Sequence, residues 1–168
     1  IGMVQDGLKT IAQPLAVVDR DNAPRLTVPH GEVRFEQVDF HYGKKSGIIG
    51  GLNLTIEAGE KIGLIGPSGA GKSTLVNLLL RLYDLQGGRI LIDGQNIAEV
   101  AQESLREQIG MITQDTSLLH RSIRENLLYG KPDASDEELW AAIRKARADE
   151  FIPQLSDAEG RTGLDAHV

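Results

Sequence analysis

Cysteine is absent from this sequence, aromatic residues are scarce, and no long apolar run occurs. The absence of cysteine excludes disulfides and thiolate metal sites, and it is consistent with a reducing compartment. No stretch of about 18 consecutive apolar residues is present, so the sequence predicts no membrane span. The remaining composition, with 40% apolar residues, predicts a soluble globular chain that can form a hydrophobic core.

An excess of basic residues is also missing, and the formal net charge is −6 at pH 7. Proteins that bind nucleic acid normally need a basic surface to displace counterions from the phosphates. We therefore expect no nucleic-acid partner. A small anionic ligand, bound by one local loop, fits this charge balance better.

The strongest motif of the chain is the loop at residues 66–74, which fits the phosphate-binding pattern G-x-x-x-x-G-K-[ST]. Before it, residues 61–66 form a short apolar run that predicts a buried strand. After it, apolar residues recur on one side of an expected helix: Leu75, Val76, Leu78, Leu79 and Leu82. Strand, loop and helix in this order are typical of proteins that bind a nucleoside triphosphate.

The residue types in this loop suit the binding of phosphate groups. Gly66, Gly69 and Gly71 permit tight turns and positive φ, so that main-chain amides can approach a β-phosphate. The first turn of the following helix adds unpaired N–H groups. We expect Lys72 to bind the β- and γ-phosphates of ATP, and the Ser73 hydroxyl to ligate Mg²⁺. The other residues expected in the nucleotide-binding loop are Pro67, Ser68, Ala70 and Thr74.

The segments around the loop predict a strand-rich layer followed by helices. Alternating apolar residues predict strands at 33–40, with a bulge near residues 36 and 37, and at 52–56, 89–93 and 109–113. Asp93-Gly94 has the composition of a hairpin turn rather than of a metal site. Helices are expected at 104–108 and 122–128, and from a capping box at 135–138 to about residue 151.

Three further segments carry weaker patterns. Trp140 continues an apolar helical face, which predicts packing rather than ligand stacking. The polar tail 156–168 carries no terminal structural pattern. Apolar spacing predicts an amphipathic helix in residues 1–15, which either docks on this chain or ends a preceding domain, and residues 19–31 are expected to be a linker.

The series of motifs resembles the nucleotide-binding domain of ATP-binding cassette (ABC) transporters, of the exporter type in which that domain follows a membrane domain on one chain. The matching segments are 38–42, 51–56, 66–74, 88–94, 113–115 and 122–127. The resemblance implies an α/β fold: a truncated P-loop NTPase domain with an antiparallel β-subdomain, part of a RecA-like core and the start of a helical subdomain. It also implies that residues 1–31 are the end of a membrane-domain helix and a connector, and that residues 32–168 are the N-terminal portion of the nucleotide-binding domain.

The same resemblance assigns further site residues. Tyr42 would stack on adenine, and Ile48 or Ile49 would contact adenine or ribose. Gln114 would touch Mg²⁺ and the attacking water, and would be catalytic together with Lys72. Without the motif series, Gln114 would be an ordinary polar residue at a strand end, and Tyr42 an aromatic covering the core. Ser117 departs from the bulky apolar residue that family members often carry there, facing the membrane domain.

The resemblance implies an ATPase motor that drives export at the cytoplasmic face of the inner membrane. Its partners would be ATP, the membrane domain of the same transporter and a second nucleotide-binding domain. The family signature Leu-Ser-Gly-Gly-Gln, the second acidic strand and the switch histidine do not occur in this sequence. We therefore expect the chain alone to bind ATP weakly without hydrolysing it. A nucleotide-binding regulatory or assembly module that never hydrolyses is the alternative, and a phosphate-loop kinase, which would carry a basic lid, is a weaker one.

Overall fold

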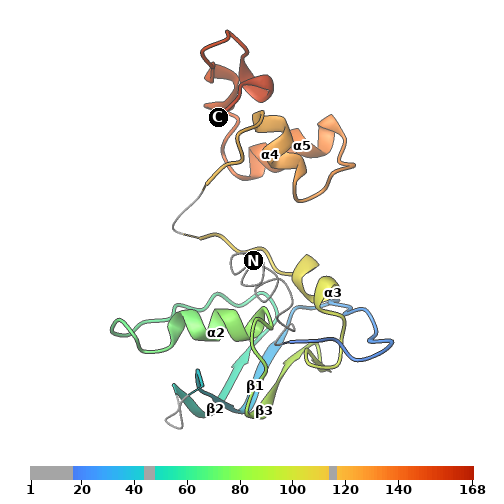
Figure 1. The fold of residues 1–168 in the computed structure, drawn as a ribbon, viewed down its shortest axis with the longest axis vertical. Coiled ribbons are helices and arrows are strands. Elements are labelled where there is room, and N and C mark those ends of the chain that lie inside the picture. The colour runs from blue at the N-terminus through green and yellow to red at the C-terminus, as the bar shows by residue number, and fades with distance from the viewer. Residues whose placement is uncertain (1–16, 44–47, 114–116) are drawn as a thin grey trace, which may run out of the picture. The chain divides into compact units, whose positions relative to one another are not determined.

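The computed structural model describes residues 17–43, 48–113 and 117–168 (Figure 1). The helix expected in residues 1–15 and the candidate catalytic residue Gln114 lie outside the described residues. The chain divides into two compact units, the first ending at Met111 and the second beginning at Ile112. In the described part of the chain, no helix is both long enough and apolar enough to cross a bilayer.

The first unit contains a four-stranded sheet with the strand order β2-β1-β3-β4. Its strands are β1 (Val33–Phe40), β2 (Ile49–Ile56), β3 (Gly87–Ile92) and β4 (Gln95–Asn96). All three pairings are antiparallel, and β1 lies between β2 and β3. The antiparallel β-subdomain expected from the sequence is therefore present, with two-residue β4 as an addition.

The core of this unit lies between the sheet and two helices, α2 (Lys72–Leu79) and α3 (Gln102–Glu107). Leu78 of α2 and Leu105 of α3 are almost fully buried there, beside Val38 of β1. Burying a side chain of this size contributes about 1.5–3 kcal/mol. Helix α2 ends at Leu79, earlier than the apolar pattern predicted. Leu82 lies beyond it and is 44% exposed.

A bulge in β1 lets Phe35 and Val38 both face the core, although they are three positions apart and would point to opposite faces of a regular strand. The pairing with β2 shifts register between these two residues, and Gln37 has a positive φ of 48°. A Cβ on Gly88 of β3 would lie 2.2 Å from the Gln37 carbonyl oxygen, so only glycine fits opposite the bulge. The predicted bulge is confirmed.

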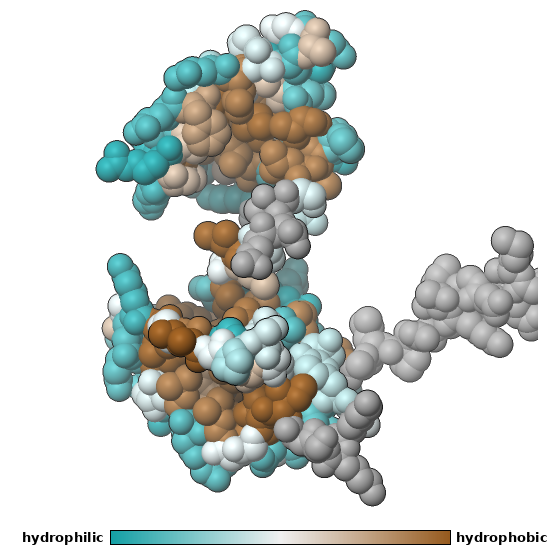
Figure 2. All heavy atoms as spheres, turned by 90° about the vertical axis from the view of Figure 1, so that its left-hand side faces the viewer, coloured by the Kyte–Doolittle hydropathy of each residue, from teal (hydrophilic) through white to brown (hydrophobic). Residues whose placement is uncertain are grey.

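Two strands expected from the sequence, at 61–66 and 109–113, are not formed. Ile65 is 99% exposed and Ile112 is 96% exposed. Apolar runs of this kind become buried parallel strands only when neighbouring strands flank them and helices cover both faces. The strands of the described residues are antiparallel and pair with one another, so apolar side chains reach the surface of the first unit (Figure 2).

The linker expected at residues 19–31 has no helix or strand, but it is packed onto the first unit rather than free. Leu26 is buried in the core, and its amide donates to the Ser104 hydroxyl at 2.9 Å. The Asp93 carboxylate accepts from the amides of residues 30, 31 and 32 at 2.9 to 3.0 Å. Hydrogen bonds from Gly31 and His30 hold the pKa of Asp93 below its usual value.

Asp93 and Gly94 form the predicted hairpin turn between β3 and β4, with φ of 46° and 75°. Two successive positive φ values are those of the tight turn that suits the twist of a hairpin. The acidic side chain of this turn therefore binds the end of residues 17–31, the connector segment.

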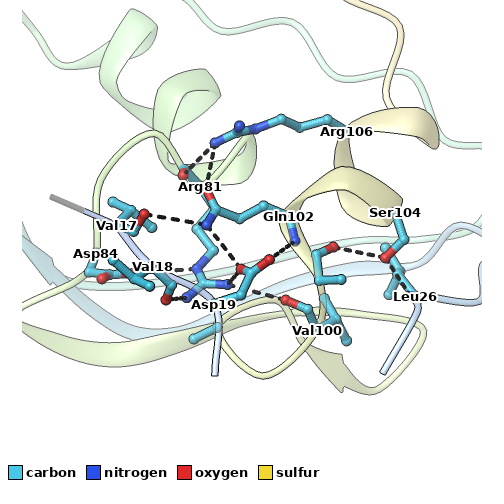
Figure 3. Close-up of polar contacts among 12 residues, drawn as sticks. Val17, Val18, Asp19, Leu26, Arg81, Asp84, Val100, Gln102, Ser104 and Arg106 are labelled. Carbon is cyan, nitrogen blue, oxygen red and sulfur yellow. Dashed lines mark hydrogen bonds and ion pairs between the residues drawn. The ribbon is translucent and has the colours of Figure 1, made fainter. Parts of the chain in front are cut away.

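The buried guanidinium of Arg81 joins the start of the connector segment to the end of α2 (Figure 3). Nη1 donates to Asp19 Oδ1 at 3.0 Å and to the Val100 carbonyl at 3.2 Å. Nη2 donates to the Val18 carbonyl at 3.1 Å. A single side chain thus joins its own turn to two segments that are far from it in the sequence.

Asp19 also stabilises the N-terminus of α3, where the N-cap residue Ala101 offers no capping side chain. The Gln102 amide donates to Asp19 Oδ2 at 3.0 Å, and its side chain donates to Oδ1 at 2.9 Å. Burial by itself would raise the pKa of Asp19, but these hydrogen bonds and the charge of Arg81 lower it below its usual value. The carboxylate therefore stays charged and serves as the cap.

The second unit contains α4 (Ile123–Leu128), α5 (Asp136–Lys145) and two 3-10 turns, η1 (Ile152–Gln154) and η2 (Gly163–Asp165). Capping boxes at Ser122 and Ser135 begin the two helices, as the sequence predicted for the second. Trp140 packs against the core, which confirms its predicted structural role. That core is formed by Ile123, Ile143, Ile152 and Leu164.

The expected extension of α5 to about residue 151 is wrong. Arg147 takes φ of 57°, and the Ala148 amide donates back to the Ile143 carbonyl at 3.0 Å. This hydrogen bond around a residue of positive φ is the Schellman end of a helix, formed here without glycine. Because glycine is the usual residue at such an end, the sequence pattern gave no indication of it.

The polar tail 156–168 is ordered against α4 rather than without structure. The Ile123 amide donates to the carbonyl oxygen of buried Ala166 at 2.9 Å, and Ser122 and His167 form an antiparallel β-bridge. The Asp157 carboxylate accepts from the His167 amide at 3.0 Å and from Arg161 Nε at 2.6 Å. Turn hydrogen bonds hold this segment, and such bonds leave no periodic pattern in a sequence.

Replacing Arg81 tests the connector network. We expect Arg81→Ala to lower the free energy of unfolding by about 2–4 kcal/mol, because it leaves Asp19 and two carbonyls without their buried partner. Arg20→Ala is the control, since Arg20 makes only an exposed 3.8 Å ion pair with Glu99, worth about 0–1 kcal/mol. Urea unfolding followed by circular dichroism measures both, and equal losses would contradict the account.

Acid should weaken the second unit through Asp157. Hydrogen bonds from the His167 backbone and the Arg161 side chain hold the pKa of Asp157 far below its usual value. Because the pKa of Asp157 is lower in the folded chain than in the unfolded chain, its ionised side chain stabilises the fold above the unfolded-state pKa of about 4. This stability is lost as the pH falls from about 4 toward the folded-state pKa. We expect Asp157→Asn to reduce the loss of stability between about pH 4 and pH 2, and exposed Asp149→Asn to leave it unchanged.

Fluorescence of Trp140, the single tryptophan, follows unfolding of this unit. Hydrogen bonds within the two capping boxes, and Lys131 beside Glu138, also lower the pKa of Glu125 and Glu138. The Asp157 variant should therefore flatten the pH dependence without abolishing it. An unchanged pH profile would show that Asp157 does not hold the tail.

Candidate ligand-binding site

A cleft of about 570 Å³ lies at the N-terminal end of α2. Three segments form it: the end of β1, the start of β2, and the loop at 66–74 that leads into the helix. The lining residues are Tyr42, Ile48, Ser68, Gly69, Gly71, Lys72, Ser73 and Thr74. The structure thus brings together most of the residues that the sequence proposed as a site. Its volume is that of a typical small-molecule pocket.

Two of the three loop glycines have the positive φ that the sequence predicted. Gly69 and Gly71 have φ of 82° and 89°, in the left-handed region that favours glycine, whereas Gly66 does not have a positive φ. Gly71 is the N-cap of α2, and no side chain caps this helix. The first amides of α2 therefore have no intrahelical acceptor, and with the helix dipole they make this end attractive to an anion.

Lys72 adds a full positive charge to this helix end. Its ammonium donates to the carbonyls of Gly66 and Pro67 at 2.7 and 2.8 Å. These bonds fold the side chain back over the start of the loop. An ammonium has three donors, and carbonyl oxygens can be exchanged for phosphate oxygens without a change in bonding geometry. The arrangement is suited to an oxygen-rich anion.

The structure separates the two isoleucine candidates. Ile48 lines the cleft, and a Cβ on Gly71 would lie 3.1 Å from its Cγ2 atom. Ile49 instead packs against the core of the sheet and does not line the cleft. Ile48 therefore remains the candidate for an apolar contact with a ligand, and Ile49 supports the core.

Tyr42 lies at the cleft edge with 40% of its surface exposed. Its hydroxyl donates to Thr74 Oγ1 at 3.3 Å, so Thr74 binds the tyrosine rather than pointing freely to a ligand. The ring also contacts Phe40 and Tyr83 edge-to-face. Tyr83 was not singled out in the sequence, where it follows the expected helix without a motif of its own.

Of the two residues predicted to bind Mg²⁺, the structure describes one. Ser73 lines the cleft, and a hydroxyl oxygen is a ligand that Mg²⁺ accepts beside phosphate oxygens and water. Gln114, the second predicted ligand, lies outside the described residues. Among the residues that the structure describes, no group of three or more His, Cys, Asp or Glu side chains could hold a metal ion. The described residues therefore fit Mg²⁺ through one protein oxygen only.

Comparison with known proteins gives consistent matches. A family model described as "ABC transporter" matches residues 49–163. An ABC transporter ATP-binding protein of Haemophilus influenzae is 56% identical over 168 residues, covering 100% of this chain and 27% of the relative. The mitochondrial iron-sulfur clusters transporter ATM1 of Candida albicans is 41% identical over 162 residues, covering 86% of this chain and 22% of the relative.

A solved structure of a bacterial Atm1-family ABC exporter with ATP bound matches with a TM-score of 0.87 at 41% identity. The match covers 98% of this chain and 28% of that chain. The chain thus spans about a quarter of the length of these relatives.

Gly71→Ala tests the loop geometry. A residue with a Cβ at φ of 89° is strained by about 1–2 kcal/mol, and the 3.1 Å approach to Ile48 adds a steric cost. We expect a larger drop in melting temperature than for Gly59→Ala, where φ is 76° but no atom lies within 4 Å of the added Cβ. Calorimetry of both variants measures the difference, and equal drops would mean that Ile48 yields without cost.

Proposed function

The chain belongs to the ABC transporter family, and we propose that its cleft binds ATP with Mg²⁺ as part of an exporter motor. Family membership confirms the resemblance predicted from the order of the motifs, and the predicted fold class with it. One observation carries the binding proposal. The uncapped N-terminus of α2 and the Lys72 ammonium converge on a cleft that also contains the exposed ring of Tyr42.

The loop residues would act on the triphosphate. Amides around Gly69 and Gly71 would donate to phosphate oxygens, and Lys72 would exchange the carbonyls of Gly66 and Pro67 for oxygens of the β- and γ-phosphates. Mg²⁺ would neutralise charge on these phosphates, and Ser73 would hold it from the protein side. The amides and the Lys72 ammonium would replace water around the anion with fixed hydrogen-bond donors.

The base would lie at the other side of the cleft. Tyr42 would stack on adenine, and Ile48 would contact the adenine or the ribose. Stacking supplies affinity through a flat apolar surface without a base-specific hydrogen bond. Thr74 supports this arrangement indirectly because its side chain binds the tyrosine hydroxyl.

The chain would work within a longer transporter. Its similarity to an iron-sulfur clusters transporter and to an Atm1-family exporter supports a motor that couples ATP binding and hydrolysis to export, with no indication of the substrate. We place residues 1–31 as the end of a membrane-domain helix and connector, and residues 32–168 as part of the nucleotide-binding domain. A second such domain would complete the ATP site at the cytoplasmic face of the inner membrane, with Gln114 orienting the attacking water.

The chain by itself would bind ATP without turning it over. Hydrolysis in phosphate-loop proteins normally requires an acidic residue at the end of a second apolar strand, and this sequence contains no such strand. The nearest acidic candidate, Asp93 directly after β3, already accepts hydrogen bonds from the amides of His30, Gly31 and Glu32.

Titration with a fluorescent ATP analogue and Mg²⁺ tests the site. We expect Lys72→Ala to weaken binding at least about tenfold, because a charge-assisted hydrogen bond contributes about 1.5–3 kcal/mol. Lys61→Ala is the matched control, since it removes an exposed lysine outside the cleft, and it should leave binding unchanged. Equal affinity of the two variants would overturn the binding proposal.

Phosphate release from Mg-ATP tests the second part of the proposal. The wild-type chain should release phosphate no faster than Lys72→Ala. Release that Lys72→Ala abolishes would show that the chain hydrolyses ATP by itself, and it would leave the binding site assignment standing.

A further inference from the structure

We propose that Tyr83 is a positioning residue, which holds the ring of Tyr42 in the orientation needed to stack on a purine base. The inference rests on the proposed function of the cleft and extends it to a residue outside the cleft. Tyr83 does not line the cleft, so it would act through Tyr42 rather than on the ligand.

Three aromatic rings pack together beside the cleft. The centroids of Tyr42 and Tyr83 are 5.0 Å apart at 85°, and those of Phe40 and Tyr42 are 4.8 Å apart at 88°. Phe40 and Tyr83 close the triangle at 5.6 Å and 52°. Edge-to-face packing is the favoured geometry of aromatic pairs. Two perpendicular neighbours therefore restrain how far the Tyr42 ring can turn.

Burial shows which ring is the anchor. Phe40 is buried, whereas Tyr42 and Tyr83 are 40% and 41% exposed. Tyr42 can thus offer surface to a ligand while Phe40 and Tyr83 support it. Its hydrogen bond to Thr74 is long, at 3.3 Å, and a bond of that length restrains the ring only weakly. The ring contacts must therefore supply most of the orientation.

The turn after α2 places Tyr83 from one side. Arg81 takes φ of 49°, and the Leu82 amide donates to the Asn77 carbonyl at 2.9 Å, which ends the helix in a Schellman turn. Arg106 donates to the carbonyls of Leu80 and Arg81 at 3.2 and 3.1 Å. With the Arg81 guanidinium bound to Asp19 (Figure 3), the residues immediately before Tyr83 are fixed.

Gln86 fixes the same segment from the other side. Its amide donates to the Asp39 carbonyl at 3.0 Å, and its side-chain oxygen accepts from the His41 amide at 2.8 Å. Asp39 and His41 flank Phe40, the last residue of β1, and Tyr42 follows His41. Hydrogen bonds on both sides of Tyr83 thus hold its segment beside the end of β1, where the two tyrosine rings meet.

The test compares two ligands that share the phosphates but not the base: Mg-ATP and inorganic tripolyphosphate with Mg²⁺. We expect Tyr83→Ala in the 168-residue chain to weaken ATP binding about 3- to 10-fold, as for the loss of an aromatic contact, and to leave tripolyphosphate binding unchanged. Tyr83→Phe keeps the ring and should retain wild-type affinity for both. Tyr129→Ala removes an 80% exposed tyrosine of the second unit and should change neither.

A double-mutant cycle shows whether Tyr83 acts through Tyr42. Tyr83→Ala should have no further effect on ATP binding once Tyr42→Ala is present, because the positioned ring is gone. Additive losses would overturn the inference. A Tyr83→Ala variant that binds both ligands equally weakly would also overturn it, because that result indicates general damage to the unit.

The outcomes separate this inference from the proposed function. If Tyr42→Ala weakens ATP binding and Tyr83→Ala does not, Tyr83 has no positioning role and the stacking proposal stands. If Tyr42→Ala has no effect while Lys72→Ala weakens both ligands, the stacking proposal and the role of Tyr83 fail together. The phosphate half of the site would then remain.

Discussion

The unpaired amides at the N-terminus of α2, together with the Lys72 ammonium bound to the carbonyls of Gly66 and Pro67 in the preceding loop, are the feature on which the site depends. Positive φ at Gly69 and Gly71 keeps this end open, and a Cβ on Gly71 would lie 3.1 Å from Ile48 Cγ2, so a side chain there would have to displace Ile48. Free donors and a positive charge at one point favour an anion with several oxygens. Leu78 anchors this helix in the core of the first unit.

The support is concentrated at the other end of the same helix. Arg106 binds the carbonyls of Leu80 and Arg81, in the turn after α2. The Arg81 guanidinium binds Asp19, the Val18 carbonyl and the Val100 carbonyl before α3. The segment between Arg81 and Gln86 then places the Tyr83 ring against the Tyr42 ring. The short helix α2 thus has the anion site at its start and, after its end, the residue that supports the Tyr42 ring. The connector segment helps to hold this end through Asp19.

Sequence patterns predicted the features that rest on local chemistry. The glycines of the loop, the bulge near Gln37, the Asp93-Gly94 turn and the capping box at Ser135 were all placed correctly. Features that depend on partners were not. Residues 61–66 and 109–113 have the composition of strands, but strand formation needs neighbours that composition cannot supply. The docked connector and tail are held by hydrogen bonds to Asp19, Asp93 and Asp157, which follow no period. Tyr83 was missed because a ring contact between distant residues leaves no local motif.

Nuclear magnetic resonance of backbone amides during titration with Mg-ATP shows whether the N-terminus of α2 binds the phosphates. We expect the amides of residues 69, 71, 72 and 73 to shift most and to become protected from solvent exchange, since they would donate to phosphate oxygens. The amides of the β3-β4 hairpin should remain unchanged. Perturbation centred on other residues, with the loop amides unaffected at saturating nucleotide, would contradict the account.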